Sequence, residues 1–464
     1  MQKVDLLITS GQVVRSDSIL KADIVVHDGK IAGLVEDGLR PEAEQVIDAK
    51  GKFVMAGVID PHNHMREPGI TKRETWVTGT MAAAAGGVTT VLEHPVSIPP
   101  TATLKAFEDK KALADGKSLV DFGLYGGDGT TSIENIPALA GAGAVAFKTF
   151  IWDYPDRAAE FEGITCTDDD ALLEIFEEVS KTGLVQTLHA ESKAIVQHYT
   201  KKLVAAGRKA PYDHEASRPV LSEVEAISRV VLFAMETGVR LNIPHLSSGS
   251  GAAVIKAAQD KGYDNITAET CPHYLFLTKE RLQEIGPYGK VNPPIRSQEE
   301  QDKLWEHLLN GTITTIGSDH GPHLPEHKEK GWDDIFEAPA GSAAVEALLP
   351  TMLNAVSQGR LTLQDVTRLM SENVAKLYGI YPRKGVIQVG SDADLILVDM
   401  GKEVTIDRDK LYTKQKDACR MFDGYHIVGW PVMTMVRGTV VMRDGEVVGE
   451  PGYGQFIARL TPES

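Results

Sequence analysis

The sequence is poor in cysteine and contains no long apolar run. Only three of its 464 residues are cysteines, Cys166, Cys271 and Cys419, and no two of them form a C-x-x-C pair. This spacing predicts neither a disulfide framework nor a thiolate zinc site, and it fits a reducing, cytoplasmic compartment. No apolar stretch reaches membrane-spanning length and the N-terminus shows no cleavable signal pattern, so we expect no membrane association.

The chain also lacks an excess of positive charge. Its net charge is −17 at pH 7, which argues against non-specific binding to nucleic acid or to an anionic membrane surface. With 42% hydrophobic and 24% charged residues, the composition is that of an ordinary globular protein. The length allows one large domain and one smaller domain.

Short strand patterns occur at both ends of the chain. Near the N-terminus they are Asp5–Ile8, Gln12–Val14, Asp23–Val26 and Ile31–Leu34, with turn residues such as Asp28 and Gly29 between them. After Gly385 the pattern returns, and Thr439–Met442 and Glu446–Val448 form a hairpin signal. Because neither set is large enough to bury a core alone, residues 1–52 and 384–464 are predicted to form one small β-sandwich domain.

The middle of the chain, residues 53–383, alternates strand-like and helix-like segments. The helix-like segments include Glu74–Ala85, Asp170–Lys181, Ser222–Met235, Ala252–Asp260 and Glu299–Leu309. Eight strand candidates are Phe53–Ile59, Val88–Leu92, Val120–Leu124, Ala144–Phe147, Leu184–Leu188, Arg240–Ile243, Asn265–Ala268 and Thr312–Ile316. This alternation predicts an α/β fold with a (β/α)8 TIM barrel. A doubly wound sheet is the alternative, but the first strand is followed by no glycine-rich phosphate turn.

Metal-binding residue types follow several of these predicted strands. The carboxyl ends of barrel strands share one face, so side chains placed there can meet. The residues concerned are His62 and His64 after the first strand, Lys148 after the fourth, His189 after the fifth, His245 after the sixth and Asp319 after the eighth. Two histidines at i and i+2 project from the same side of a strand, and imidazole is a common metal ligand. We therefore expect a metal site at this end of the barrel.

Lys148 permits two interpretations from the residues alone. Its neighbours Ala146, Phe147 and Phe150 are apolar, and burial lowers the pKa of a lysine, which then becomes nucleophilic and can capture carbon dioxide as a carbamate. A carbamate is anionic and has two oxygens that can bridge two cations. Alternatively, the lysine extends its ammonium group to the barrel rim.

The motifs as a set resemble the amidohydrolase superfamily, and within it the cyclic amidases: hydantoinases (dihydropyrimidinases), allantoinases and dihydroorotases. The motifs are Asp60-Pro61-His62-Asn63-His64, Phe147-Lys148, Leu188-His189-Ala190-Glu191, Pro244-His245-Leu246-Ser247 and Gly317-Ser318-Asp319-His320. The likeness covers nearly the whole chain, including both ends.

This resemblance implies a binuclear metal centre, usually of zinc, and a lysine carboxylated by carbon dioxide. It implies that one ion is bound by His62, His64 and Asp319, the other by His189 and His245, and that Lys148 bridges the two. The expected reaction is attack of a metal-bridging hydroxide on the carbonyl of a cyclic ureide or imide. Asp319 is the expected proton shuttle to the leaving nitrogen.

Several residues bear on the choice of substrate. Arg66, Asn292 and His323 resemble the substrate-binding residues of dihydroorotases, in which the arginine binds a carboxylate. Val96 departs from that branch, which usually has asparagine there, whereas Lys148 and the segment Tyr378–Asp394 favour a hydantoinase or allantoinase. Asp153 stands where D-selective hydantoinases have an oxyanion-binding tyrosine, and Tyr154 is one residue away. The hydantoinase or allantoinase type is the first prediction, and dihydroorotase is the alternative.

A scaffold protein is the alternative of a different class, because some dihydropyrimidinase relatives have lost the metal ligands and serve as scaffold proteins. All six ligand positions are kept here, which favours an enzyme. The family resemblance further implies a homo-oligomer, a tetramer or a dimer, acting on a small molecule. The remaining histidines, including His94, are expected to be structural or on the surface, and Cys271-Pro272-His273 is expected to serve packing.

Overall fold

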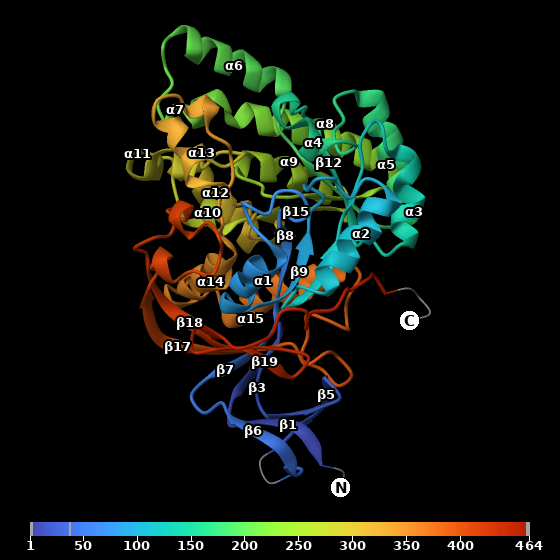
Figure 1. The fold of residues 1–464 in the computed structure, drawn as a ribbon, viewed down its shortest axis with the longest axis vertical. Helices are drawn as coiled ribbons and strands as arrows, with labels where there is room; N and C mark the ends of the chain where they lie inside the picture. Colours follow the sequence, from blue (N-terminus) through green and yellow to red (C-terminus); the bar gives the residue numbers. More distant parts are fainter. Residues whose placement is uncertain (1–2, 37–38, 461–464) are drawn as a thin grey trace.

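Both ends of the chain contribute strands to two stacked β-sheets. A computed structural model describes residues 3–36 and 39–460 (Figure 1). The smaller sheet has the order β5-β4-β1-β6 and consists of β1 (Val4–Thr9), β4 (Asp23–His27), β5 (Lys30–Val35) and β6 (Ala43–Asp48). The larger has the order β20-β19-β18-β17-β7-β2-β3 and consists of β2 (Gln12–Val14), β3 (Ile19–Lys21), β7 (Phe53–Ala56), β17 (Leu395–Thr405), β18 (His426–Val436), β19 (Thr439–Arg443) and β20 (Glu446–Val447).

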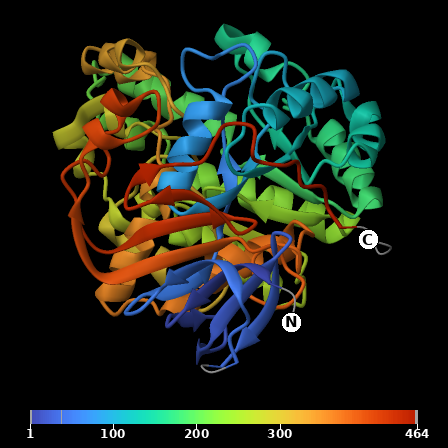
Figure 2. The same cartoon turned by 60° about the horizontal axis from the view of Figure 1, so that its bottom comes forward.

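Apolar side chains from the two sheets pack into one core. Ile8 and Ile24 of the smaller sheet are buried together with Val54, Leu395 and Met435 of the larger one. Strands from the beginning and from the end of the chain therefore share one hydrophobic cluster. The predicted β-sandwich built from both termini is confirmed, and Figure 2 shows its blue and red strands side by side.

The middle of the chain forms a barrel of parallel strands. They are β8 (Val58–Asn63), β9 (Val88–Glu93), β10 (Asp121–Leu124), β11 (Gly126–Gly127), β12 (Ala146–Phe150), β13 (Val185–His189), β14 (Arg240–Ile243), β15 (Ile266–Thr270) and β16 (Thr315–Ile316). Neighbouring strands pair in parallel from β8 to β10 and from β11 to β16. A parallel bridge between Asn63 and His320 joins the first strand to the segment after the last. The predicted TIM barrel is confirmed.

Helices surround the barrel (Figure 1). The longer ones are α1 (Trp76–Ala85), α2 (Leu104–Asp115), α3 (Ile136–Gly141), α5 (Asp169–Thr182), α6 (Lys193–Ala205), α8 (Val220–Thr237), α9 (Gly249–Gln259), α12 (Gln298–Leu309) and α14 (Leu348–Ser357). Shorter ones are α4 (Ala158–Phe161), α7 (Asp213–Ser217), α10 (Pro272–Phe276), α11 (Arg281–Ile285), α13 (Pro325–Glu329), α15 (Leu363–Thr367) and α16 (Asn373–Leu377). No helix in the described part of the chain is long and apolar enough to cross a membrane.

The first predicted barrel strand, Phe53–Ile59, is in fact two strands separated by Gly57. The first of them, β7, pairs with β17 and β2 of the larger sheet, whereas β8 begins the barrel. A Cβ atom on residue 57 would lie 2.0 Å from Oγ1 of Thr89, so only glycine fits at this crossing. The division into residues 1–52 plus 384–464 and residues 53–383 stays a prediction, and the pairing of β7 associates Phe53–Ala56 with the sandwich.

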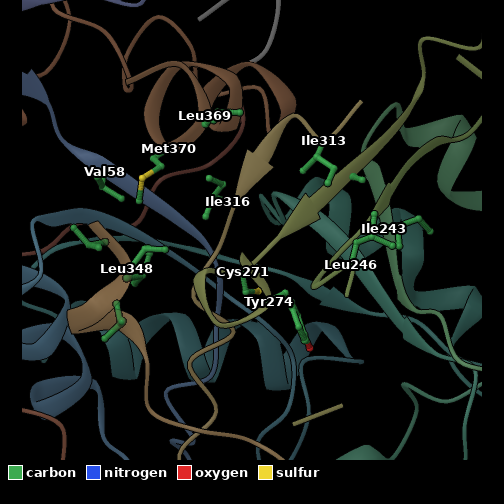
Figure 3. Packing of buried hydrophobic residues seen from close by; sticks show 14 of the residues in the cluster. Val58, Ile243, Leu246, Cys271, Tyr274, Ile313, Ile316, Leu348, Leu369 and Met370 are labelled. Carbon is green, nitrogen blue, oxygen red and sulfur yellow. The ribbon is translucent and has the colours of Figure 1, made fainter. Parts of the chain in front are cut away.

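Two other strands differ from their predicted limits. The fourth barrel strand extends to Phe150, so Lys148 lies within β12 and not after it. The eighth is reduced to Thr315 and Ile316, although the backbone N–H groups of Thr314 and Gly317 also donate to β15, to the carbonyls of Ala268 and Thr270. Cys271 is buried in the barrel core near Tyr274 and Ile316 (Figure 3), as predicted for a packing residue.

A buried charge cluster connects the barrel to the sandwich. Nζ of Lys384, a fully buried side chain, lies 2.6 Å from Oδ2 of Asp394 and 3.0 Å from Oδ2 of Asp392. The same ammonium group pairs with Asp121 on barrel strand β10, and Arg437 at the end of β18 also pairs with Asp121. Each of these charges has an opposite charge in contact, which makes their burial tolerable.

Candidate active site

The ends of the first and last barrel strands are tied together by hydrogen bonds. The Asp60 carboxylate accepts from the backbone N of Ser318 at 2.9 Å and from its Oγ at 2.6 Å. The backbone N of His64 donates to the carbonyl of His320 at 2.9 Å. These bonds bring Asp319 to His62 at the end of β8 and to His64 just after it: its Oδ1 lies 3.2 Å from Nε2 of His62 and 3.8 Å from Nε2 of His64.

The fifth and sixth strands supply a second pair of ligand atoms. His189 ends β13 and His245 follows β14, and Nδ1 of His189 lies 3.1 Å from Nε2 of His245. Both rings are buried. His245 has a positive φ of 42° and Asp319 one of 48°, which is uncommon for residues other than glycine. Such backbone conformations occur where the surrounding structure holds a functional side chain in place.

Lys148 lies within the same site. Its side chain is fully buried and its Nζ has no hydrogen-bond partner in residues 3–36 and 39–460. The nitrogen is 5.1 Å from the centre of the Phe150 ring. Burial lowers the pKa of Lys148 to about 8, although the carboxylates of Asp319 and Glu269 oppose this shift. The lysine therefore does not reach the rim, which was the alternative interpretation of its sequence context.

The site residues fit a divalent metal ion. Burial lowers the pKa of His62 to about 4 and that of His64 and His245 well below the usual value, so these rings are neutral and can donate lone pairs. Two donors of a tetrahedral zinc ion are about 3.3 Å apart, from Zn–N bonds of about 2.05 Å. The His62–Asp319 and His189–His245 contacts, at 3.2 and 3.1 Å, match that spacing. The buried Nζ of Lys148, which has no hydrogen-bond partner in the described residues, is a further indication that this site binds another chemical group.

His94 is a member of this cluster that the sequence did not indicate. Nitrogen atoms of His62, His64 and His94 lie within 4.8 Å of one another, which would allow the three to hold a metal ion. The His94 ring stacks on that of His62, with centroids 3.9 Å apart and 7° between the planes. His94 is thus buried, not on the surface, and it holds the plane of the His62 ring. Its position after β9, on the same face as His62, was the available signal.

The cluster opens into a cavity of about 730 Å³. Arg66 and Asn292, two of the three predicted substrate-binding residues, line it, together with Tyr154. His323, the third, is buried behind Gly341, with neither ring nitrogen hydrogen-bonded in the described residues, and does not line the cavity. Asp153 points to the surface, where it pairs with Lys193 at 2.6 Å. The other charged residues that line the cavity are mostly cationic: Arg73, Arg157, Arg218, Lys290 and Lys330.

Comparisons with known proteins agree with this architecture. The model of the amidohydrolase family matches residues 53–441. The chain is 43% identical to an L-hydantoinase of Paenarthrobacter aurescens over 463 residues, which is 99% of both chains. The chain belongs to the amidohydrolase family. This amidohydrolase is also 37% identical to an allantoinase of Deinococcus radiodurans, over 97% of each chain.

Solved structures place the amidohydrolase in the same branch. An L-hydantoinase from Arthrobacter aurescens superimposes with a TM-score of 0.94 at 43% identity, covering 98% of this chain and 100% of that one. A D-hydantoinase superimposes with a TM-score of 0.90 at 33% identity, covering 98% and 99%. The protein is therefore a hydrolase of the cyclic-amidase branch, of the hydantoinase and allantoinase type, and its buried histidine cluster is a metal-binding site.

Proposed function

We propose that this amidohydrolase opens a five- or six-membered cyclic ureide or imide by hydrolysis of a ring amide bond. The observation that carries the proposal is the convergence of side chains from five strand ends on one cavity: His62 from β8 and His64 just after it, Lys148 from β12, His189 from β13, His245 after β14 and Asp319 after β16. The names of the relatives, L-hydantoinase and allantoinase, support a cyclic ureide as the substrate.

We further propose that the site holds two divalent ions, zinc in the first instance. His62, His64 and Asp319 would bind one ion, His189 and His245 the other, and Lys148 would bridge them as a carbamate. To form that group, the Lys148 amine forms an N–C bond to carbon dioxide and loses one proton. Ions bound there would lower the pKa of a water molecule and polarise the ring carbonyl.

Asp319 carries the proton transfer in this proposal. Its carboxylate takes a proton from the attacking water as the water oxygen bonds to the carbonyl carbon. It then returns the proton to the ring nitrogen as the C–N bond breaks, because an unprotonated amide nitrogen is a poor leaving group. The products are a carboxylic acid, which releases its remaining proton to solvent and becomes a carboxylate, and a terminal NH2 group, now at opposite ends of one open chain. Asp319 borders the cavity, so its side chain can reach the substrate.

Dihydroorotase activity is a second candidate, favoured by the state of Arg66. This arginine is only 4% exposed, and its Nε has no hydrogen-bond partner in residues 3–36 and 39–460. None of the described carboxylates forms a salt bridge with it, whereas Arg73 and Arg157, which line the same cavity, both pair with Glu160. A buried guanidinium without a counter-ion favours a carboxylate on the substrate. Asn292 and His323 are proposed to assist it.

Replacing Arg66 with leucine separates the two candidates. If Arg66 binds a substrate carboxylate, kcat/KM for dihydroorotate should fall about 10- to 100-fold, the value of one or two charge-assisted hydrogen bonds, and that for hydantoin should change less than about 3-fold. Steady-state kinetics on both substrates measures this. Arg73→Leu is the control, because Arg73 is already neutralised by Glu160. An equal loss on both substrates would exclude the carboxylate-binding role.

The decisive test of the function is hydrolysis of a substrate panel with metal content measured on the same sample. The panel contains hydantoin, both hands of a 5-substituted hydantoin, dihydrouracil, allantoin and dihydroorotate. We expect turnover of hydantoins or allantoin and two ions per chain. Turnover of dihydroorotate alone would replace the first candidate by the second, and substoichiometric metal without turnover would indicate a scaffold protein. Sedimentation of the same sample tests the proposed homo-oligomer, a tetramer or a dimer.

A further inference from the structure

Glu269 is a buried carboxylate in contact with the first histidine of the site. It lies on β15, and its Oε1 is 2.9 Å from Nδ1 of His62. Both side chains are 1% exposed. A histidine that binds a metal through one ring nitrogen generally donates its second N–H to a carboxylate, so in the metal-bound form this contact places the ring proton of His62 on Nδ1. The lone pair is then on Nε2, the atom that faces Asp319 at 3.2 Å.

The barrel leaves room for this contact at Gly317. Glu269 and His62 come from β15 and β8, and β16 with Gly317 lies between them in the barrel. A Cβ atom on residue 317 would be 2.9 Å from Oε1 of Glu269 and 3.0 Å from Cβ of His62. Any larger residue would push one of the two side chains away. The glycine thus permits the carboxylate to reach across one strand to the imidazole.

Glu191 makes the corresponding contact with the other pair of histidines, but to the opposite ring atom. Its Oε2 is 2.8 Å from Nε2 of His189, and the same oxygen accepts from Arg218. The ring proton of His189 is therefore on Nε2, and the lone pair is on Nδ1, which faces His245 at 3.1 Å. Arg218 holds Glu191 in its ionised, accepting form.

We propose that Glu269 and Glu191 are positioning residues, which hold the rings of His62 and His189 in place by accepting the ring N–H that is not turned toward the metal site. This inference rests on the proposed metal centre. Histidine ligands generally donate their second N–H to a carboxylate or carbonyl, and removal of that partner usually weakens metal binding 10- to 100-fold. Neither glutamate is a metal ligand or a catalytic residue here, since each acts through its histidine.

A double-mutant cycle on zinc binding tests the proposal for Glu269. Zinc affinity of the apoprotein is measured by competition with a chelator for wild type, Glu269→Met, His62→Ala and the double variant. We expect Glu269→Met to weaken one of the two ions 10- to 100-fold in the wild-type background. In the His62→Ala background the same change should lower zinc affinity less than about 3-fold, because Glu269 acts through the His62 ring and that ring is absent there. Glu269→Gln, which keeps an acceptor oxygen, should recover part of the affinity.

The control is Glu300→Met, because Glu300 is a buried glutamate that accepts hydrogen bonds from Ser250 and contacts none of the six proposed ligands. It should leave both zinc affinities unchanged. Equal losses of zinc affinity in both backgrounds would overturn this inference alone. The same holds if wild type binds two ions and turns over a cyclic amide, and Glu269→Met and Glu191→Met leave its zinc affinity unchanged. If wild type binds no zinc and has no activity, the proposed function fails with it.

Discussion

Replacing Asp319 with asparagine is expected to lower kcat for cyclic amide hydrolysis by about 10²- to 10⁴-fold, the usual contribution of general acid–base catalysis. The asparagine keeps an oxygen that can face His62 and His64, but its amide cannot accept and return a proton. Burial raises the pKa of Asp319, whereas His62 and Lys148 oppose that shift.

The measurement is kcat on the best substrate of the panel, with metal content determined on the same preparation. Asp156→Asn is the matched control, because Asp156 also lines the cavity but belongs to the Pro155–Arg157 turn and forms no hydrogen bond or ion pair with the proposed histidine ligands in the described part of the chain. It should change kcat less than about 3-fold. An Asp319→Asn enzyme that retains both metals and nearly full turnover would contradict the proposed mechanism.

Replacing Lys384 with methionine is expected to lower the free energy of unfolding by about 3–5 kcal/mol, the usual cost of removing one partner of a buried ion pair. The change leaves Asp121, Asp392 and Asp394 with less compensation. Arg437 and Arg383 remain near two of these carboxylates, but neither contacts Asp394 through its guanidinium. The loss should lower the urea concentration at the midpoint of the first unfolding transition. We specify the first transition because a chain of this size need not unfold in one step.

Lys30→Met is the control for this prediction. Lys30 also pairs with Asp392, at 2.9 Å, but its side chain is 52% exposed. A surface ion pair contributes about 0–1 kcal/mol, so this variant should be nearly as stable as wild type. If Lys384→Met were as stable as Lys30→Met, the buried charge cluster would not contribute to the stability of the contact between sandwich and barrel.

The proposed ligand set could be predicted because the carboxyl ends of all strands of a TIM barrel lie on the same face. His62, His189, His245 and Asp319 are far apart in the sequence, yet each lies at the same end of a strand, and the structure brings them together. Burial of Lys148 could not be decided from its neighbours, since apolar residues flank many rim lysines as well. It follows from the extension of β12 to Phe150, which keeps the lysine inside the strand.

Other features depend on contacts across strands, which a single sequence does not specify. Glu269 is within a strand pattern, and only the packing of β15 against β8 across Gly317 shows that it reaches His62. His94 is recognised only through its stacking on His62. The split of Phe53–Ile59 at Gly57 was hidden because the segment is apolar throughout, whether it belongs to one sheet or to two.

The pairing of β7 has a consequence for synthesis of the chain on the ribosome. β7 lies between β2, from the first residues, and β17, from the last part of the chain. While the barrel is being made, one edge of β7 has no partner, and exposed strand edges are sites of aggregation. Some 340 residues separate β7 from β17, so the larger sheet can close around β7 only after the whole barrel has been synthesised.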